Sequence, residues 1–133
     1  MFYPMFLMVL LTFIIGLITM KMRIANVKSG DVSPQYFKLM EGQEVPEIIT
    51  KTTRSFNNQF EVPVLFYAGC IIYISLGVES LIGLALAWSF VLLRCIHAYI
   101  HLTYNHLIHR MLTFWFAFLS AVGLWLNLLF HQI

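Results

Sequence analysis

Two clusters of polar residues interrupt strongly apolar stretches of the sequence, and the first contains residue types that bind anions and amides. Its members, Arg54, Asn58 and Glu61, are spaced i, i+4 and i+7. At about 100° per residue, this spacing places them on one stripe of a helix. A guanidinium and a side-chain amide on one stripe can hydrogen-bond the charged groups and the backbone of a peptide-like ligand. The first cluster is therefore a candidate ligand site.

The second cluster contains Arg94, His97, His101 and Asn105, spaced i, i+3, i+7 and i+11 on one helical stripe. Its two histidines can hydrogen-bond a ligand, and the same pair could also bind a metal or haem iron. Because no Asp or Glu lies near them in the sequence, we expect no metal. His97 and His101 are thus candidate ligand-binding and catalytic residues.

Glu61 and Arg94 are expected to lie at similar depths on adjacent helices. Arg94 lies about nine residues before the end of its apolar run. Glu61 lies about seven residues after Arg54, and Arg54 stands at the start of the preceding apolar run. A lone charge inside a membrane segment is costly. We therefore predict a buried ion pair between Glu61 and Arg94, whose role in joining two helices is favoured over a direct role in chemistry.

The segments around these clusters are those of an integral membrane protein. Of the 133 residues, 60% are hydrophobic and 11% are charged, whereas soluble domains are about half apolar and a quarter charged. This composition excludes a soluble enzyme, a nucleic-acid binder and a disordered chain. Each of four apolar runs is long enough for a helix of about 20 residues. We predict an all-α bundle of four transmembrane helices in one domain, with helices at about 1–20, 56–78, 81–103 and 111–130 and a polar loop at about 21–55.

The basic residues predict the orientation of this bundle. Arg110 lies between the third and fourth runs, and the N-terminal tip, the turn near Glu79 and the C-terminal tail contain no Lys or Arg. Positive residues mark the cytoplasmic side of a membrane protein. We therefore place the long loop in the cytoplasm and both termini outside. The loop and its edges hold Lys21, Arg23, Lys28, Lys38, Lys51 and Arg54.

The segment RSFNNQFEVPVLFY resembles the MAPEG superfamily, the membrane-associated proteins of eicosanoid and glutathione metabolism. The residues that match its motif are Arg54, Asn58, Glu61, Pro63 and Phe66. The chain length, the four predicted helices and the polar first loop also agree, so the resemblance covers nearly the whole chain. The local version of the motif is similar to the poorly characterised bacterial branch, which implies a bacterial inner membrane.

The resemblance implies a homotrimer that binds glutathione between neighbouring subunits at the cytoplasmic side. Arg54, Asn58 and Glu61 would then contact glutathione. His97 and His101 stand where active members have tyrosines, and Arg110 is the candidate cation for the glutathione thiolate. The implied function is a glutathione-dependent transferase or peroxidase that acts on lipophilic small molecules taken from the membrane lipid.

Two alternatives belong to other classes of protein. One is a non-enzymatic membrane module that binds a lipid or a partner in the same cleft. The feature that separates it from an enzyme is a convergent cation, either Arg110 or Arg23, in the space between Arg54 and His101. The other alternative is a haem or metal protein that uses His97 and His101.

Overall fold

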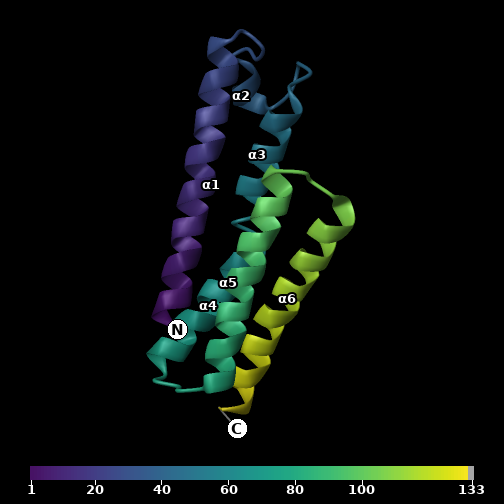
Figure 1. The fold of residues 1–133 in the computed structure, drawn as a ribbon. Coiled ribbons are helices and arrows are strands. Elements are labelled where there is room, and N and C mark those ends of the chain that lie inside the picture. The colour runs from purple at the N-terminus through teal and green to yellow at the C-terminus, as the bar shows by residue number, and fades with distance from the viewer. Residues whose placement is uncertain (132–133) are drawn as a thin grey trace.

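The computed structural model describes residues 1–131, and its regular elements are helices, as the sequence predicts (Figure 1). Three of them are long and apolar enough to cross a membrane. Their outward faces expose large hydrophobic side chains along their length, which suits contact with lipid. In chain order the helices are α1 (Phe2–Lys28), α2 (Tyr36–Leu39), α3 (Glu47–Asn57), α4 (Val62–Ser75), α5 (Leu81–Leu102) and α6 (Leu107–Phe130), of which α1, α5 and α6 are the three candidate spans.

The long helices run side by side, and the start of α1 and the end of α6 lie at the same end of the bundle (Figure 1). We call this the terminal end. The opposite end holds α2, the start of α3 and the basic residues that follow the apolar part of α1, and we call it the basic end. The α5 and α6 helices are joined by a short turn at residues 103–106 and pack against each other as an antiparallel pair.

The helix expected at about 56–78 is interrupted, so its predicted bounds are wrong. Helix formation starts earlier, at Glu47, stops at residues 58–61 and resumes as α4, which ends at Ser75. Pro63 lies in the first turn of α4 and explains the interruption, since proline has no N–H to continue a helix from the preceding turn. The 14 residues of α4 span about 21 Å at 1.5 Å per residue, less than a hydrocarbon core of about 30 Å.

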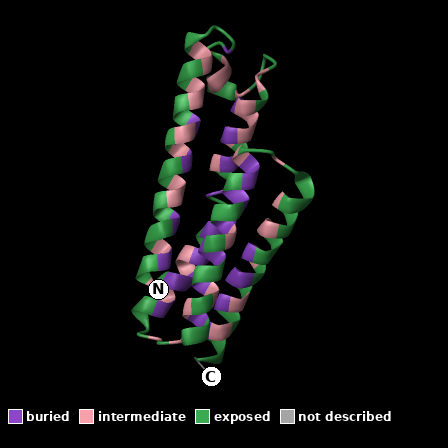
Figure 2. Cartoon of the chain, in the orientation of Figure 1, coloured by how far each residue is buried: buried purple, intermediate pink, exposed green. Residues whose placement is uncertain are grey.

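The core lies between α4, α5 and α6, where the buried side chains gather (Figure 2). At its centre the rings of Phe66 and Phe90 stack with their centroids 4.3 Å apart. Cys70 and Leu124 are completely buried beside them. This packing holds α4 against α5 and α6. It therefore also sets the position of residues 58–61, the break before α4, relative to these two helices.

A hydrogen-bond network closes the terminal end. The Tyr73 hydroxyl lies 2.7 Å from Asn127 Oδ1 and 3.2 Å from the carbonyl of Leu124. Ser80 donates to the same Asn127 oxygen at 2.7 Å and accepts the N–H of Gly83 at 3.0 Å, which caps the start of α5. A Cβ atom on Gly83 would stand 2.8 Å from the Tyr73 hydroxyl oxygen. This position therefore requires glycine.

Candidate functional site

A cavity of about 220 Å³ brings together three residues that the sequence marked as candidates. Asn58 comes from the end of α3, His97 from α5 and Arg110 from the first turn of α6. The rest of the wall is apolar and belongs to the first part of α6, with the side chains of Leu107, Met111 and Phe114. A cation, an imidazole and an amide thus surround one small space.

Asn58 is held in place through its backbone. It is the C-cap residue of α3, and its carbonyl accepts a hydrogen bond of 2.7 Å from Nη2 of Arg94. The side chain of Arg94 is completely buried. Within residues 1–131, Arg94 Nε and Nη1 have no hydrogen-bond partner. Arg94 therefore crosses from α5 to stabilise the break between α3 and α4.

The predicted ion pair between Glu61 and Arg94 is not formed in the described part of the chain, where no carboxylate oxygen lies within 4.0 Å of Arg94. The physical reason is the interrupted helix. Glu61 is the N-cap residue of α4, with φ −91° and ψ −103°, and its side chain is exposed. The backbone carbonyl of Asn58 takes the place expected for the carboxylate of Glu61.

His97 is oriented by α6. Its Nδ1 lies 3.0 Å from the carbonyl oxygen of Arg110 and 3.3 Å from Oγ1 of Thr113. A carbonyl can only accept, so Nδ1 carries the proton and donates it. In the neutral ring Nε2 is then the basic nitrogen, and it has no partner among residues 1–131. The imidazole of His97 therefore presents Nε2 as a hydrogen-bond acceptor.

His101 lies one helical turn further along α5. Its ring meets that of His97 edge-on, with centroids 5.9 Å apart. It is almost fully buried, and neither ring nitrogen has a hydrogen-bond partner in the described chain. His101 does not line the cavity. Of the two histidines, the geometry therefore gives the direct position to His97.

Arg110 is anchored by the turn between α5 and α6. Its Nη1 donates to Oδ1 of Asn105 at 2.7 Å. Asn105 has φ 52°, and its backbone N–H donates to the carbonyl of Ile100 at 2.8 Å. A left-handed residue just after a helix is a usual place for asparagine. The anchoring role of Asn105 could have been inferred from this preference, whereas nothing in the sequence indicates that Thr113 orients His97.

The first cluster does not form one continuous stripe. Arg54 lies in the last turn of α3 and Glu61 before α4, and both side chains are exposed outside the cavity. The alternative cation, Arg23, is engaged elsewhere. It donates to Oγ1 of Thr53 at 3.1 Å, and its guanidinium carbon lies 5.3 Å from the ring centre of Phe37. Arg110 is therefore the cation that converges with Asn58 and His97.

The metal-protein alternative requires several metal-binding side chains close to one another. Among residues 1–131 no group of three or more His, Cys, Asp or Glu side chains could hold a metal ion. The chemistry that the cavity offers is binding of an anion by Arg110 and hydrogen bonding by Asn58 and His97.

A sequence profile of the MAPEG family matches residues 1–130. The chain belongs to the MAPEG family. The resemblance noted from the motif at Arg54 is thereby confirmed, and the match takes in all of α1 to α6. Together with the three apolar helices, MAPEG membership identifies an integral membrane protein. No curated relative and no solved structure matches the chain.

Proposed function

We propose that this MAPEG protein is a glutathione-dependent transferase or peroxidase that acts on lipophilic electrophiles at the membrane face of its basic end. The observation that carries the proposal is the convergence of Asn58, His97 and Arg110 on one cavity. A thiol becomes a good nucleophile only when it loses its proton, and a nearby base or cation promotes this loss. The cavity offers both.

In the proposed reaction, Nε2 of His97 takes the proton of the glutathione thiol, and the guanidinium of Arg110 stabilises the thiolate. In a transfer, the sulfur forms a bond to an electrophilic carbon and the leaving group departs with its electron pair. In a peroxidase cycle, two glutathiones become a disulfide while a lipid hydroperoxide becomes an alcohol and water. Asn58 holds the peptide part of glutathione by hydrogen bonds.

The cavity also supports a homotrimer. At about 220 Å³ it is smaller than the roughly 300–1,000 Å³ of typical ligand pockets. It holds the thiol end of a tripeptide, while the remainder lies outside, toward the exposed Arg54 and Glu61. A neighbouring subunit completes the site on that side. In this arrangement α3 and α4 together make a fourth, discontinuous crossing, and the basic end faces the bacterial cytoplasm.

The test is titration of the detergent-purified full chain with glutathione, by calorimetry for binding and by ultraviolet absorbance for the thiolate. We expect binding at millimolar glutathione and a thiolate signal. His97→Phe should lower the thiolate absorbance at equal bound glutathione, because the thiol then loses its proton acceptor. His109→Phe is the matched control, since His109 lies exposed on α6 outside the cavity and should change little.

If glutathione does not bind at millimolar concentration, the enzyme proposal fails for this thiol. The non-enzymatic module that binds a lipid or a partner then becomes the better account. An equal loss of thiolate absorbance in His97→Phe and His109→Phe would exclude His97 as the group that takes the proton. The proposal that glutathione binds in the cavity would not be affected by that result.

A further inference from the structure

Two exposed histidines lie side by side where the turn after α5 leads into α6. His106 is the N-cap residue of α6, and His109 follows it in the first turn of the helix. Residues three apart at a helix surface are neighbours. The two ring centroids are 4.5 Å apart, and the ring planes are tilted by 45°. The side chain of His106 does not cap the helix, and its ring lies against that of His109 instead.

The distance between the two rings is that of imidazoles that share one metal ion. An imidazole nitrogen binds Zn²⁺ at about 2.0–2.1 Å, so two rings on one ion, at an angle of about 90–110°, have centroids roughly 4.5–5.2 Å apart. The observed 4.5 Å lies at the short end of this range. It corresponds to neighbouring ligands of a square-planar or octahedral ion. Because both side chains are exposed, they can turn a nitrogen toward such an ion without any change in the helix.

Tyr104 supplies the outer hydrogen-bond partner that metal-binding histidines usually have. Its hydroxyl lies 3.2 Å from Nδ1 of His109, and the two rings meet edge-on with their centroids 5.8 Å apart. A histidine that binds a metal nearly always donates its other ring N–H to an acceptor, which fixes the tautomer and the orientation of the ring. The hydroxyl of Tyr104 can accept this hydrogen. Nε2 of His109 is then the nitrogen that binds the ion.

The surroundings of the pair select the kind of cation. Mg²⁺ and Ca²⁺ require several oxygen ligands, and in residues 1–131 no Asp or Glu joins the pair to make a group of three. The start of a helix carries a partial positive charge, which opposes a cation that gains only electrostatic energy. Transition-metal ions bind imidazole nitrogen directly, with an affinity that rises from Mn²⁺ to Cu²⁺. The cation that fits the pair is therefore a transition-metal ion.

We propose that His106 and His109 bind one divalent ion of the group Ni²⁺, Cu²⁺ and Zn²⁺, with water in the remaining coordination positions. The ion joins the residue before α6 to the first turn of α6, and so holds the turn at residues 103–106 to the helix. That turn includes Asn105, which accepts the hydrogen bond of Arg110. Bound metal should therefore slow the local opening of this part of the chain.

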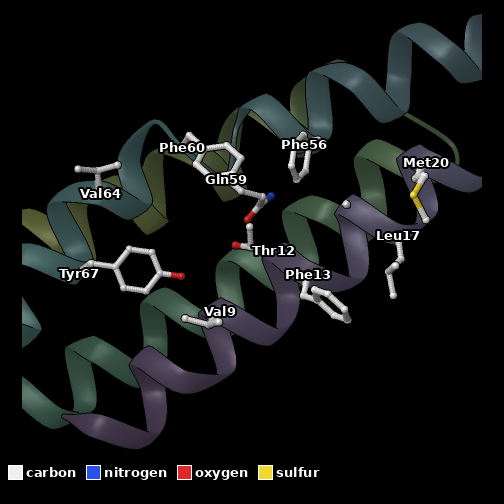
Figure 3. Close-up of a pocket in the computed structure, with 11 residues that line it drawn as sticks. Val9, Thr12, Phe13, Leu17, Met20, Phe56, Gln59, Phe60, Val64 and Tyr67 are labelled. Carbon is white, nitrogen blue, oxygen red and sulfur yellow. The ribbon is translucent and has the colours of Figure 1, made fainter. Parts of the chain in front are cut away.

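The histidine pair lies outside the small cavity of the candidate functional site. It also lies outside a long apolar groove between α1 and the interrupted pair of α3 and α4, in which Figure 3 shows Gln59 and Thr12 facing each other. The metal proposal therefore does not rest on the proposed glutathione chemistry, and either proposal can fail without the other.

The test is calorimetric titration of the detergent-purified full chain, free of any histidine tag, with Ni²⁺, Cu²⁺ and Mg²⁺. We expect Cu²⁺ to bind more tightly than Ni²⁺ and Mg²⁺ not to bind. His106→Gln and His109→Gln should each weaken Ni²⁺ binding at least tenfold, since loss of a ligand costs no less than loss of its outer partner, about 10–100-fold. Tyr104→Phe should weaken it about tenfold.

His131→Gln is the matched control, because His131 is also exposed but lies at the other end of α6. It should bind Ni²⁺ as the unaltered protein does. Equal weakening in His131→Gln and His106→Gln would overturn the proposal. So would Ni²⁺ binding that survives in the double variant of His106→Gln and His109→Gln, since the ion would then lie elsewhere.

Amide hydrogen exchange gives a second measurement. Ni²⁺ should slow exchange at residues 105–110 in the unaltered protein and have no effect there in the double variant. Exchange that is equally fast with and without saturating Ni²⁺ in the unaltered protein would overturn the proposal that the ion holds the turn to α6.

Discussion

Replacement of Gly83 by alanine should destabilise the bundle, although alanine is the better helix former. The added Cβ would lie 2.8 Å from the Tyr73 hydroxyl oxygen and 2.9 Å and 3.0 Å from two of its ring carbons. Real Cβ atoms do not approach other atoms this closely, so the ring must move. The ring is rigid and only 1% exposed, and its hydroxyl contacts Asn127 and Leu124.

The magnitude follows from three effects. Strain from overpacking a core costs about 1–3 kcal/mol. Each displaced hydrogen bond costs about 0.5–1.5 kcal/mol. Alanine in place of glycine within a helix returns about 1 kcal/mol. With both hydrogen bonds of the Tyr73 hydroxyl displaced, we therefore expect Gly83→Ala to lower the free energy of unfolding by about 1–5 kcal/mol.

Gly123→Ala is the matched control. The three atoms nearest to a Cβ there all belong to Leu86, whose two methyl carbons would lie at 3.3 Å, and that side chain can turn away. This variant should be as stable as the unaltered protein or up to about 1 kcal/mol more stable. The measurement is unfolding in mixed detergent micelles followed by circular dichroism. If the two alanine variants unfold alike, the close packing of Tyr73 on Gly83 is refuted.

Three further predictions concern the site. Arg54→Ala should weaken glutathione binding about tenfold in calorimetry, as expected when one charge-assisted hydrogen bond is lost, and an unchanged affinity would exclude Arg54 from the ligand. Asn105→Gly keeps the left-handed turn at φ 52° but frees Arg110, so thiolate absorbance should fall while stability is kept, whereas Asn105→Asp should retain the signal. Arg94→Met removes the hydrogen bond to the Asn58 carbonyl together with a costly buried charge, so the free energy of unfolding should change by less than about 1 kcal/mol. Amide hydrogen exchange at residues 58–61 should become faster, and unchanged exchange would contradict the anchoring role of Arg94.

Apolar runs were enough to predict the all-α fold and the approximate places of α1, α5 and α6, because a membrane demands long, uninterrupted hydrophobic helices. The interruption before α4 was harder to place. Pro63 indicates a kink, but a sequence does not say where the freed backbone groups will find partners.

The partner of Arg94 illustrates the same limit in the candidate site. Its charge and its depth suggested a carboxylate partner, and the nearest one in the expected helix was Glu61. The group that accepts its hydrogen bond is the carbonyl of Asn58, which every residue type would supply equally. Likewise, helical spacing marked both histidines, while only the packing of α6 against α5 decides that His97 lines the cavity and His101 does not.

The interrupted helix has an electrostatic consequence. The peptide dipoles of α3 sum to a partial negative charge at its C-terminal end, where cations are favoured. Asn58 caps that end, and its carbonyl is the one that receives Arg94. The guanidinium is therefore neutralised in part by the dipole of a half-helix that ends inside the bundle, and this partner has no proton to gain or lose. The positive charge of Arg94 is thus kept in the protein interior by a group that stays the same at every pH.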